Sequence, residues 1–210
     1  MIAKHRQLLS FEEELRVDKF QIRIAFGNED KETLARLKEF NSLKHIEGGY
    51  SQAPKNPVEM DPYSIWIYVL DRKGELLSTQ RVVEKREENL LPIELAVSLA
   101  NKCRYAVLEE NVADWNSVSF IKSRTGWEAA VKNFAAIAKL CLFKKYTKVY
   151  GFYNKETPAI ERIYKKNGAV DSLKYPGDVF LPGYYLRGEV VKARIIELDK
   201  NALQRVATQF

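Results

Sequence analysis

Residues 115–153 read WNSVSFIKSRTGWEAAVKNFAAIAKLCLFKKYTKVYGFY, and this stretch carries the strongest periodic pattern of the chain. From residue 126 to residue 146 apolar side chains recur every three or four positions, which predicts a long amphipathic helix. The positions that define the stripe are Trp127, Val131, Phe134, Ala138 and Cys141. The flanking segments 115–121 and 149–153 have the short, apolar or alternating patterns of β-strands. A strand, a long helix and a second strand in this order predict an α/β fold.

The chain before this stretch predicts a strand, a helix and a hairpin. The expected elements are a strand over 20–26, a helix over 31–43, paired strands over 65–70 and 76–83, and a helix over 91–100. Asn28 or Asp30 can cap the first of these helices. Pro92 suits the first turn of the second, where its missing N–H has no cost.

The chain after it predicts a short helix over 158–166, stopped by Gly168, and a long final strand over 184–198 with a bulge at Gly188. Hairpins early in the chain and βα units later imply a mixed sheet with helices on both faces. The whole chain, 1–210, is expected to form one domain, with residues 1–19 as a peripheral helix.

Composition narrows the class of protein. The net charge is +6, which favours anionic partners such as nucleic acid, lipid headgroups, phosphates or an acidic protein. Cys103 and Cys141 lie in no CxxC or Cys/His cluster, so we expect reduced thiols and no zinc site. The first fifteen residues lack the apolar run of a signal peptide, and no segment reaches the ~20 apolar residues of a membrane span. A cytoplasmic protein is the default expectation.

Residues 161–169 read ERIYKKNGA and follow the strand 149–153. Together with the element order from 20 to 198, this segment resembles the GNAT superfamily of N-acetyltransferases. The resemblance implies a three-layer α/β/α fold whose mixed central sheet is splayed between its fourth and fifth strands. It also implies that Tyr164 protonates the departing thiolate of coenzyme A. From the residues alone, Tyr164 is equally an aromatic packing residue.

The donor-binding loop of GNAT proteins lies between a strand and the long helix, where backbone N–H groups hold a pyrophosphate. The corresponding segment here is SRTGWE, residues 123–128. Gly126 fits the family pattern, whereas Ser123 and Glu128 depart from it. The resemblance assigns donor binding to Lys122, Arg124, Gly126 and Trp127.

In this departure the chain is similar to the branch of autoinducer synthases and N-acyl amino acid synthases, which often take the acyl chain from acyl carrier protein. The carrier is acidic, and the lysine face of the helix 126–146 would steer it. A solvated lysine face is the alternative. Arg36 and Phe40 on the first helix are similar to the Arg-x-x-x-Phe pattern of the autoinducer synthases. Asp61, ahead of the hairpin, and Arg81 in TQRVV on its second strand resemble their acidic pair and their Thr-x-Arg; all four residues are candidates for acceptor binding.

Amine acylation needs a base and an acid near a thioester. Asp114 ranks first as the base because it opens the strand expected to line the thioester, and Glu94 and Glu109 are further candidates. Arg81 lies among apolar neighbours, so we expect a carboxylate partner such as Asp61, or the carboxylate of a substrate. His5 and His45 fall in a predicted tail and loop without a Ser or Cys partner.

The sequence therefore predicts an N-acyltransferase that moves an acyl group from acyl carrier protein or acyl-coenzyme A to the amine of a small molecule such as an amino acid. The alternative is a non-catalytic binding protein on the same fold, with nucleic acid as a partner for the basic and aromatic residues of 144–150. The acyl-transfer hypothesis requires the strands 115–121 and 149–153 to lie side by side and then part.

Overall fold

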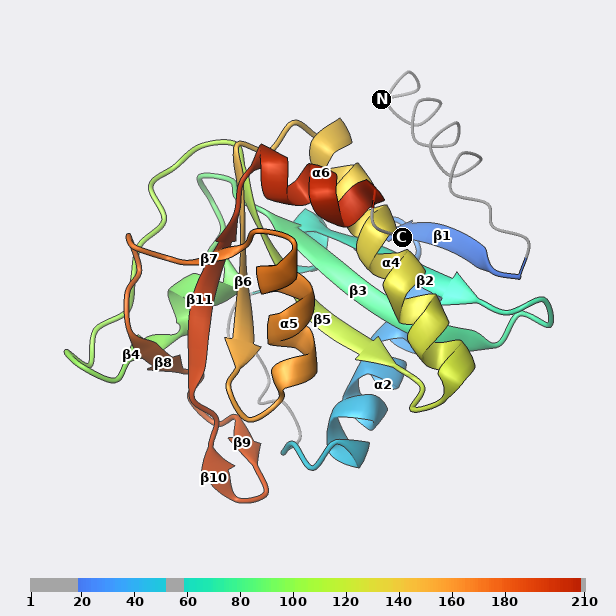
Figure 1. Cartoon of the computed structure of the whole chain (residues 1–210), viewed down its shortest axis with the longest axis horizontal. Coiled ribbons are helices and arrows are strands. Elements are labelled where there is room, and N and C mark those ends of the chain that lie inside the picture. Colours follow the sequence, from blue (N-terminus) through green and yellow to red (C-terminus); the bar gives the residue numbers. More distant parts are fainter. Residues whose placement is uncertain (1–18, 52–58, 209–210) are drawn as a thin grey trace.

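The computed structural model describes residues 19–51 and 59–208. Within these residues one nine-stranded sheet has the order β1-β2-β3-β5-β6-β11-β8-β4, with β7 pairing to β11 (Figure 1). Its strands are β1 (Gln21–Phe26), β2 (Ser64–Leu70), β3 (Leu76–Glu84), β4 (Val97–Ser98), β5 (Val112–Phe120), β6 (Lys148–Asn154), β7 (Val170–Asp171), β8 (Asp178–Phe180) and β11 (Ala193–Leu198). A separate hairpin pairs β9 (Tyr185–Leu186) with β10 (Glu189–Val190).

Helices cover both faces of the sheet (Figure 1). They are α2 (Lys31–Glu47), α3 (Pro92–Leu95), α4 (Arg124–Phe143), α5 (Pro158–Lys166) and α6 (Lys200–Thr208), with a short 3-10 turn η1 (Asp61–Tyr63). The largest core cluster joins the sheet to α4, α5 and α6. Two smaller clusters lie on the opposite face and include residues of α3 and α2. The layers are therefore α/β/α, as the sequence predicts.

Among the described residues the sheet is mixed, with a single parallel pair. β5 and β6 run parallel, whereas the other neighbouring strands of the sheet are antiparallel. The long helix α4 connects these two strands, as a parallel crossover requires. No helix in the described part of the chain has the length and apolar character needed to span a membrane.

The long helix follows its predicted stripe except at its first turn. Phe134, Ala138 and Cys141 are fully buried, and burial raises the pKa of the Cys141 thiol. Trp127 was expected on the same stripe but is 39% exposed, with its ring against Phe120. The first turn of α4 begins just after β5 ends, and Arg124 and Thr125 in the same turn are exposed as well.

Two predicted elements are shorter or more divided than expected. The helix expected over 91–100 is only the single turn α3, because the chain then becomes extended and Val97 and Ser98 pair with β8. The strand expected over 184–198 is broken into β9, β10 and β11. Gly188 lies in the β9–β10 turn with φ of +87°, so it forms a hairpin turn and not a bulge.

The C-terminal helix α6 was not predicted. Asp199 caps it by accepting a hydrogen bond from the Ala202 N–H at 2.7 Å. Its apolar residues Ala202, Leu203 and Val206 are fully buried. The capping signal was visible in the sequence, but the segment is only nine residues long and its helicity depends on packing against α4. The expected peripheral helix at residues 1–19 lies, apart from Lys19, outside the described residues.

Candidate active site

The defining feature of the site is the divergence of β5 and β6. The two strands pair from Val112 with Lys148 to Trp115 with Gly151. Beyond that point β5 continues to Phe120 and β6 to Asn154 without pairing to each other. Figure 1 shows the strands side by side at one end and well apart at the other, with α5 in front of them. The predicted parting of the fourth and fifth long strands is therefore present.

A bulge deforms β5 just after the strands part. On β3, Thr79 faces Ser119 but Arg81 faces Asn116, so β5 has one extra residue at this point. Ser117 has φ of +54°, in the left-handed region that a serine rarely adopts. Such strain is found where a backbone must present its groups in a fixed direction. The bulge lies in the half of β5 that β6 does not cover.

Tyr164 lies on one face of the sheet at the point of divergence. Its ring is 1% exposed and meets the rings of Trp115 and Phe134 edge-on, with centroids 5.4 and 5.7 Å away. Trp115 is the last paired residue of β5, and it donates a hydrogen bond to Gln80 at 2.7 Å. Burial raises the pKa of the Tyr164 hydroxyl, so Tyr164 keeps its proton near neutral pH.

Asp114 lies on the opposite face, within a buried polar chain. One carboxylate oxygen accepts the Ile93 N–H at 3.1 Å and the other accepts the Asn116 amide at 2.9 Å. Asn116 in turn accepts hydrogen bonds from Arg81 Nε at 2.7 Å and from the Ser117 hydroxyl at 2.9 Å. Asp114 belongs to the paired half of β5. The series of hydrogen bonds through Asn116 connects its carboxylate to the bulge.

The pKa of Asp114 gives a prediction about stability. Burial raises this pKa to about 7, against the hydrogen bond from Asn116 and the charge of Arg81, which lower it. Between pH ~4 and ~7 the unfolded chain has released the Asp114 proton, whereas the folded protein still holds it. This contribution to the free energy of unfolding is complete below pH ~4 and is lost as the pH rises through 7.

We therefore expect wild type to lose a few kcal/mol relative to Asp114→Asn between pH 4.5 and pH 7.5. Urea unfolding of both proteins at the two pH values measures the difference. Because the other carboxylates are the same in both proteins, their pH dependence cancels. The informative quantity is the change with pH of the stability difference between the two proteins. A difference that is the same at both pH values would contradict the raised pKa.

The predicted acceptor residues do not converge on one point. Arg36 donates a hydrogen bond to the Gly74 carbonyl in the β2–β3 turn at 3.0 Å, and Phe40 packs on the core cluster formed with α2. Asp61 pairs with Lys38 of α2. The expected ion pair of Arg81 with Asp61 is not formed. Arg81 instead binds Asn116, and its guanidinium lies 5.4 Å from the Trp66 ring centroid.

Glu94 is held in a structural role. It forms a buried ion pair with Lys85 at 2.8 Å. It also accepts the N–H groups of Leu91 at 2.7 Å and Val107 at 2.9 Å. Glu109, the other candidate base, is bound by Lys174 at 2.7 Å, and it accepts hydrogen bonds from two tyrosine hydroxyls. Both carboxylates brace loops, and each of their oxygens accepts at least one hydrogen bond.

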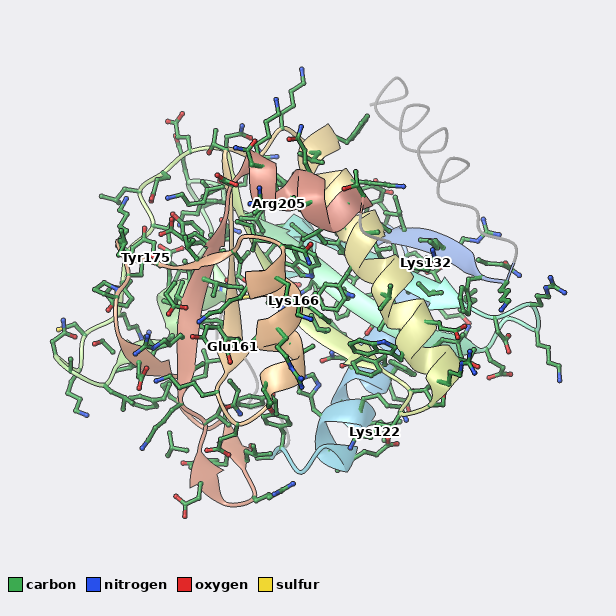
Figure 2. The ribbon with its side chains drawn as sticks, viewed as in Figure 1. Lys122, Lys132, Glu161, Lys166, Tyr175 and Arg205 are labelled. Carbon is green, nitrogen blue, oxygen red and sulfur yellow. The ribbon has the colours of Figure 1, made fainter. Side chains whose placement is uncertain are left out.

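The loop at the start of α4 is tightly packed. Ser123 caps the helix by accepting the Gly126 N–H at 3.0 Å. A side chain on Gly126 would collide with the Ile121 carbonyl oxygen, which lies 2.0 Å from the position of its Cβ. Arg124 pairs with Glu128 at 3.2 Å and is largely exposed. Lys122 reaches the Glu47 carbonyl at the end of α2 at 3.3 Å, so its ammonium group lies beside that helix (Figure 2).

A second group of side chains lies beside the divergence on the face covered by α2. We call it the divergence cluster; it consists of Asn41, His45, Tyr50, Ser119, Asn154 and Tyr184. Sequence reasoning placed His45 in a loop and missed this group. The helix α2 in fact continues to Glu47, and its last turns bring His45 against Ser119. The one signal for this cluster in the sequence was Tyr50, an aromatic residue between Phe40 and the hairpin.

No protein-family model matches the chain, and no curated protein matches its sequence. Among solved structures, TofI in a ternary complex with an inhibitor and MTA superposes with a TM-score of 0.58 at 16% identity, covering 88% of this chain and 95% of that one. Spermidine N-acetyltransferase from Vibrio cholerae, in complex with CoA and spermine, gives 0.57 at 11% identity, covering 90% and 99%.

A third solved structure carries the name of the fold family. The acetyltransferase of the GNAT family from Streptococcus pneumoniae superposes with a TM-score of 0.57 at 9% identity, covering 86% of this chain and 99% of that one. Identities at this level establish the fold and not the activity. The chain has the GNAT fold.

Proposed function

We propose that this chain is an N-acyltransferase that moves an acyl group from a thioester to the amine of a small molecule. The observation that carries the proposal is the divergence of β5 and β6 after the Trp115–Gly151 pair. Paired strands would satisfy each other's backbone groups, whereas parted strands leave them for a ligand. The resemblance to GNAT proteins and the superposition on acetyltransferases support the same assignment.

The proposed reaction uses the two faces of the sheet separately. The amine nitrogen attacks the thioester carbonyl carbon, a C–N bond forms and the C–S bond breaks. The backbone N–H groups at the Ser117 bulge steady the oxyanion, which is the usual role of preorganised amides. Sulfur leaves as a thiolate and takes the proton of Tyr164, and the tyrosinate then regains a proton from solvent.

Asp114 acts in this proposal as a positioning residue. It holds Asn116, and Asn116 accepts the hydroxyl hydrogen bond of Ser117. Arg81 completes the chain from the neighbouring strand β3. Because both oxygens of Asp114 already accept hydrogen bonds, its contribution is to fix the shape of the bulge and not to move a proton.

The donor is proposed to be acyl-coenzyme A or an acyl carrier protein. The spermidine N-acetyltransferase that superposes on this chain was solved with CoA, which supports the first. The second rests on the resemblance of the sequence to the branch of autoinducer synthases and N-acyl amino acid synthases. In either case we propose that Lys122 and the first turn of α4, with Arg124 and Trp127, bind the donor, and that Gly126 packs this turn against Ile121. The acceptor is proposed to be a small amine such as an amino acid.

Nucleic acid is the less favoured partner. The segment 144–150 suggested a face of alternating basic and aromatic side chains, but Tyr146 and Tyr150 are buried and have no face to offer a base. Lys144 and Lys148 are held in ion pairs of 2.7 and 2.6 Å with glutamates of β3 and β11. These contacts remove the feature on which the alternative depended.

The test is acyl transfer by the purified full chain. Acyl-coenzyme A and acyl carrier protein thioesters of several chain lengths are each offered with a panel of amino acids and polyamines, and N-acyl products are measured by mass spectrometry. The thiol released from the donor is measured in the Cys103→Ser variant, because exposed Cys103 would itself react with the thiol reagent. We expect product from at least one donor class. A folded protein that yields no N-acyl product from either class would contradict the proposed function.

A further inference from the structure

The divergence cluster connects the two parted strands. On the β5 side, Asn41 of α2 donates hydrogen bonds to the Ser117 carbonyl at 3.0 Å and to the Ser119 hydroxyl at 2.7 Å. On the β6 side, Asn154 donates to the Tyr50 hydroxyl at 3.3 Å. His45 lies between these two anchors, 3.4 Å from Ser119 Oγ and with its ring 5.5 Å from that of Tyr50. Its imidazole is therefore placed across the divergence.

The backbone around the cluster is fixed from two directions. Tyr50 forms a bridge with Leu186, the Ser51 N–H donates to the Tyr185 carbonyl at 2.8 Å, and the Arg187 N–H donates to the Gly49 carbonyl at 2.8 Å. These bonds join the β9–β10 hairpin to the end of α2. They also hold Tyr184 in a stack on Tyr50, with ring centroids 5.1 Å apart. The aromatic surroundings of His45 are thus built by the fold.

The hydrogen bonding of His45 specifies its tautomer. Its Nδ1 lies 2.8 Å from the backbone carbonyl oxygen of Asn41, and a carbonyl only accepts hydrogen bonds. Nδ1 therefore carries the hydrogen, and Nε2 of the neutral ring has a lone pair. Nε2 is then a proton acceptor held in a fixed orientation, which is what a general base needs.

The surroundings keep this ring neutral. Burial lowers the pKa of His45, against the bond to the Asn41 carbonyl, which raises it. Tyr50 and Tyr184 are the titratable groups whose rings face it. On its own helix, Lys44 and Glu47 pair with each other at 2.7 Å. From the start of α4, Lys122 reaches only the backbone of Glu47.

We propose that Nε2 of His45 accepts the proton of the acceptor amine as that amine attacks the thioester. This inference rests on the proposed function and adds the base that Asp114, Glu94 and Glu109 do not supply. One amine proton passes to Nε2 as the C–N bond forms, and the imidazolium returns it to solvent after the product leaves. The departing sulfur takes its proton separately from Tyr164, on the other face of the sheet.

The decisive variant is His45→Asn. The asparagine amide nitrogen occupies the place of Nδ1 and still donates to the Asn41 carbonyl, but no group replaces Nε2. We expect kcat to fall about 10²-fold with little change in KM or in the thermal midpoint. For wild type, the slope of log kcat/KM against pH should change from about two to about one at the pKa of His45, and for His45→Asn it should stay near one. His5→Gln is the matched control, since His5 and His45 are the two histidines of the chain.

An independent measurement uses the same control. Nitrogen NMR of the full chain, assigned with His5→Gln, reports the tautomer and pKa of His45 without any substrate. We expect a neutral ring with the hydrogen on Nδ1 and a pKa below the usual 6.5. Active wild type with unimpaired His45→Asn, or a hydrogen on Nε2, would overturn the inference alone. If wild type makes no product with any donor, the proposed function fails and the base role fails with it, while the NMR result still stands for the geometry.

Discussion

Gly126→Ala is expected to lower the free energy of unfolding by about 3 kcal/mol or more, although alanine is the better helix former. The added Cβ would lie 2.0 Å from the Ile121 carbonyl oxygen and 2.8 Å from the carbonyl carbon. Both are backbone atoms of the segment that leads from β5 into α4, so neither can move without separating the helix from the strand. Chemical denaturation monitored by circular dichroism measures the loss.

Thr125→Ala is the matched control for this effect. Thr125 is exposed in the same helical turn, and its substitution is expected to change stability by less than about 0.5 kcal/mol. The comparison separates two explanations for the glycine. If Gly126→Ala were as stable as wild type and only bound donor more weakly, the glycine would serve the ligand and the packing argument would be wrong.

Tyr164→Phe is expected to lower kcat about 10²-fold while leaving the thermal midpoint close to that of wild type. The substitution keeps the ring that packs edge-on against Trp115 and Phe134, so the core is preserved. It removes only the hydroxyl that protonates the departing thiolate in the proposed reaction. Because proton donation occurs at the C–S bond and not in binding, KM for the donor should change little.

Tyr175→Phe provides the comparison for a lost tyrosine hydroxyl. Its hydroxyl donates a hydrogen bond to Glu109 at 2.9 Å in a loop brace away from the proposed chemistry. We expect a stability loss of about 1 kcal/mol and unchanged kcat. Equal kcat for Tyr164→Phe and wild type, with a donor whose thiolate is a poor leaving group, would show that solvent supplies the proton and that Tyr164 is a packing residue.

The candidate site divides into residues that local sequence could find and residues that it could not. Tyr164 was predicted as a site residue because its segment has a recognisable pattern on one short helix. Arg81 was noticed as a charge among apolar neighbours, but its partner proved to be Asn116, thirty-five positions away on the adjacent strand. Partner choice across a sheet depends on register, and the β-bulge between Thr79 and Arg81 shifts that register by one residue.

His45 shows the same limit more strongly. Its helix was expected to end at residue 43, and Leu43 and Ile46 in the last turns are exposed. The helix continues to Glu47 because its last turns are fastened by contacts outside the helix, such as the bonds from Asn41 to β5. Tertiary contacts of this kind extend a helix beyond what its own propensity predicts.

The sequence by itself determined the order of the main elements, the long helix between β5 and β6, and a layered α/β architecture. It did so because side-chain periodicity and capping act over a few neighbouring residues. Only the tertiary structure decided where β5 and β6 stop pairing, how the Ser117 bulge is stabilised, and that His45, Ser119 and Tyr184 meet. Those features arise from register and packing between segments far apart in the chain, and no local pattern encodes them.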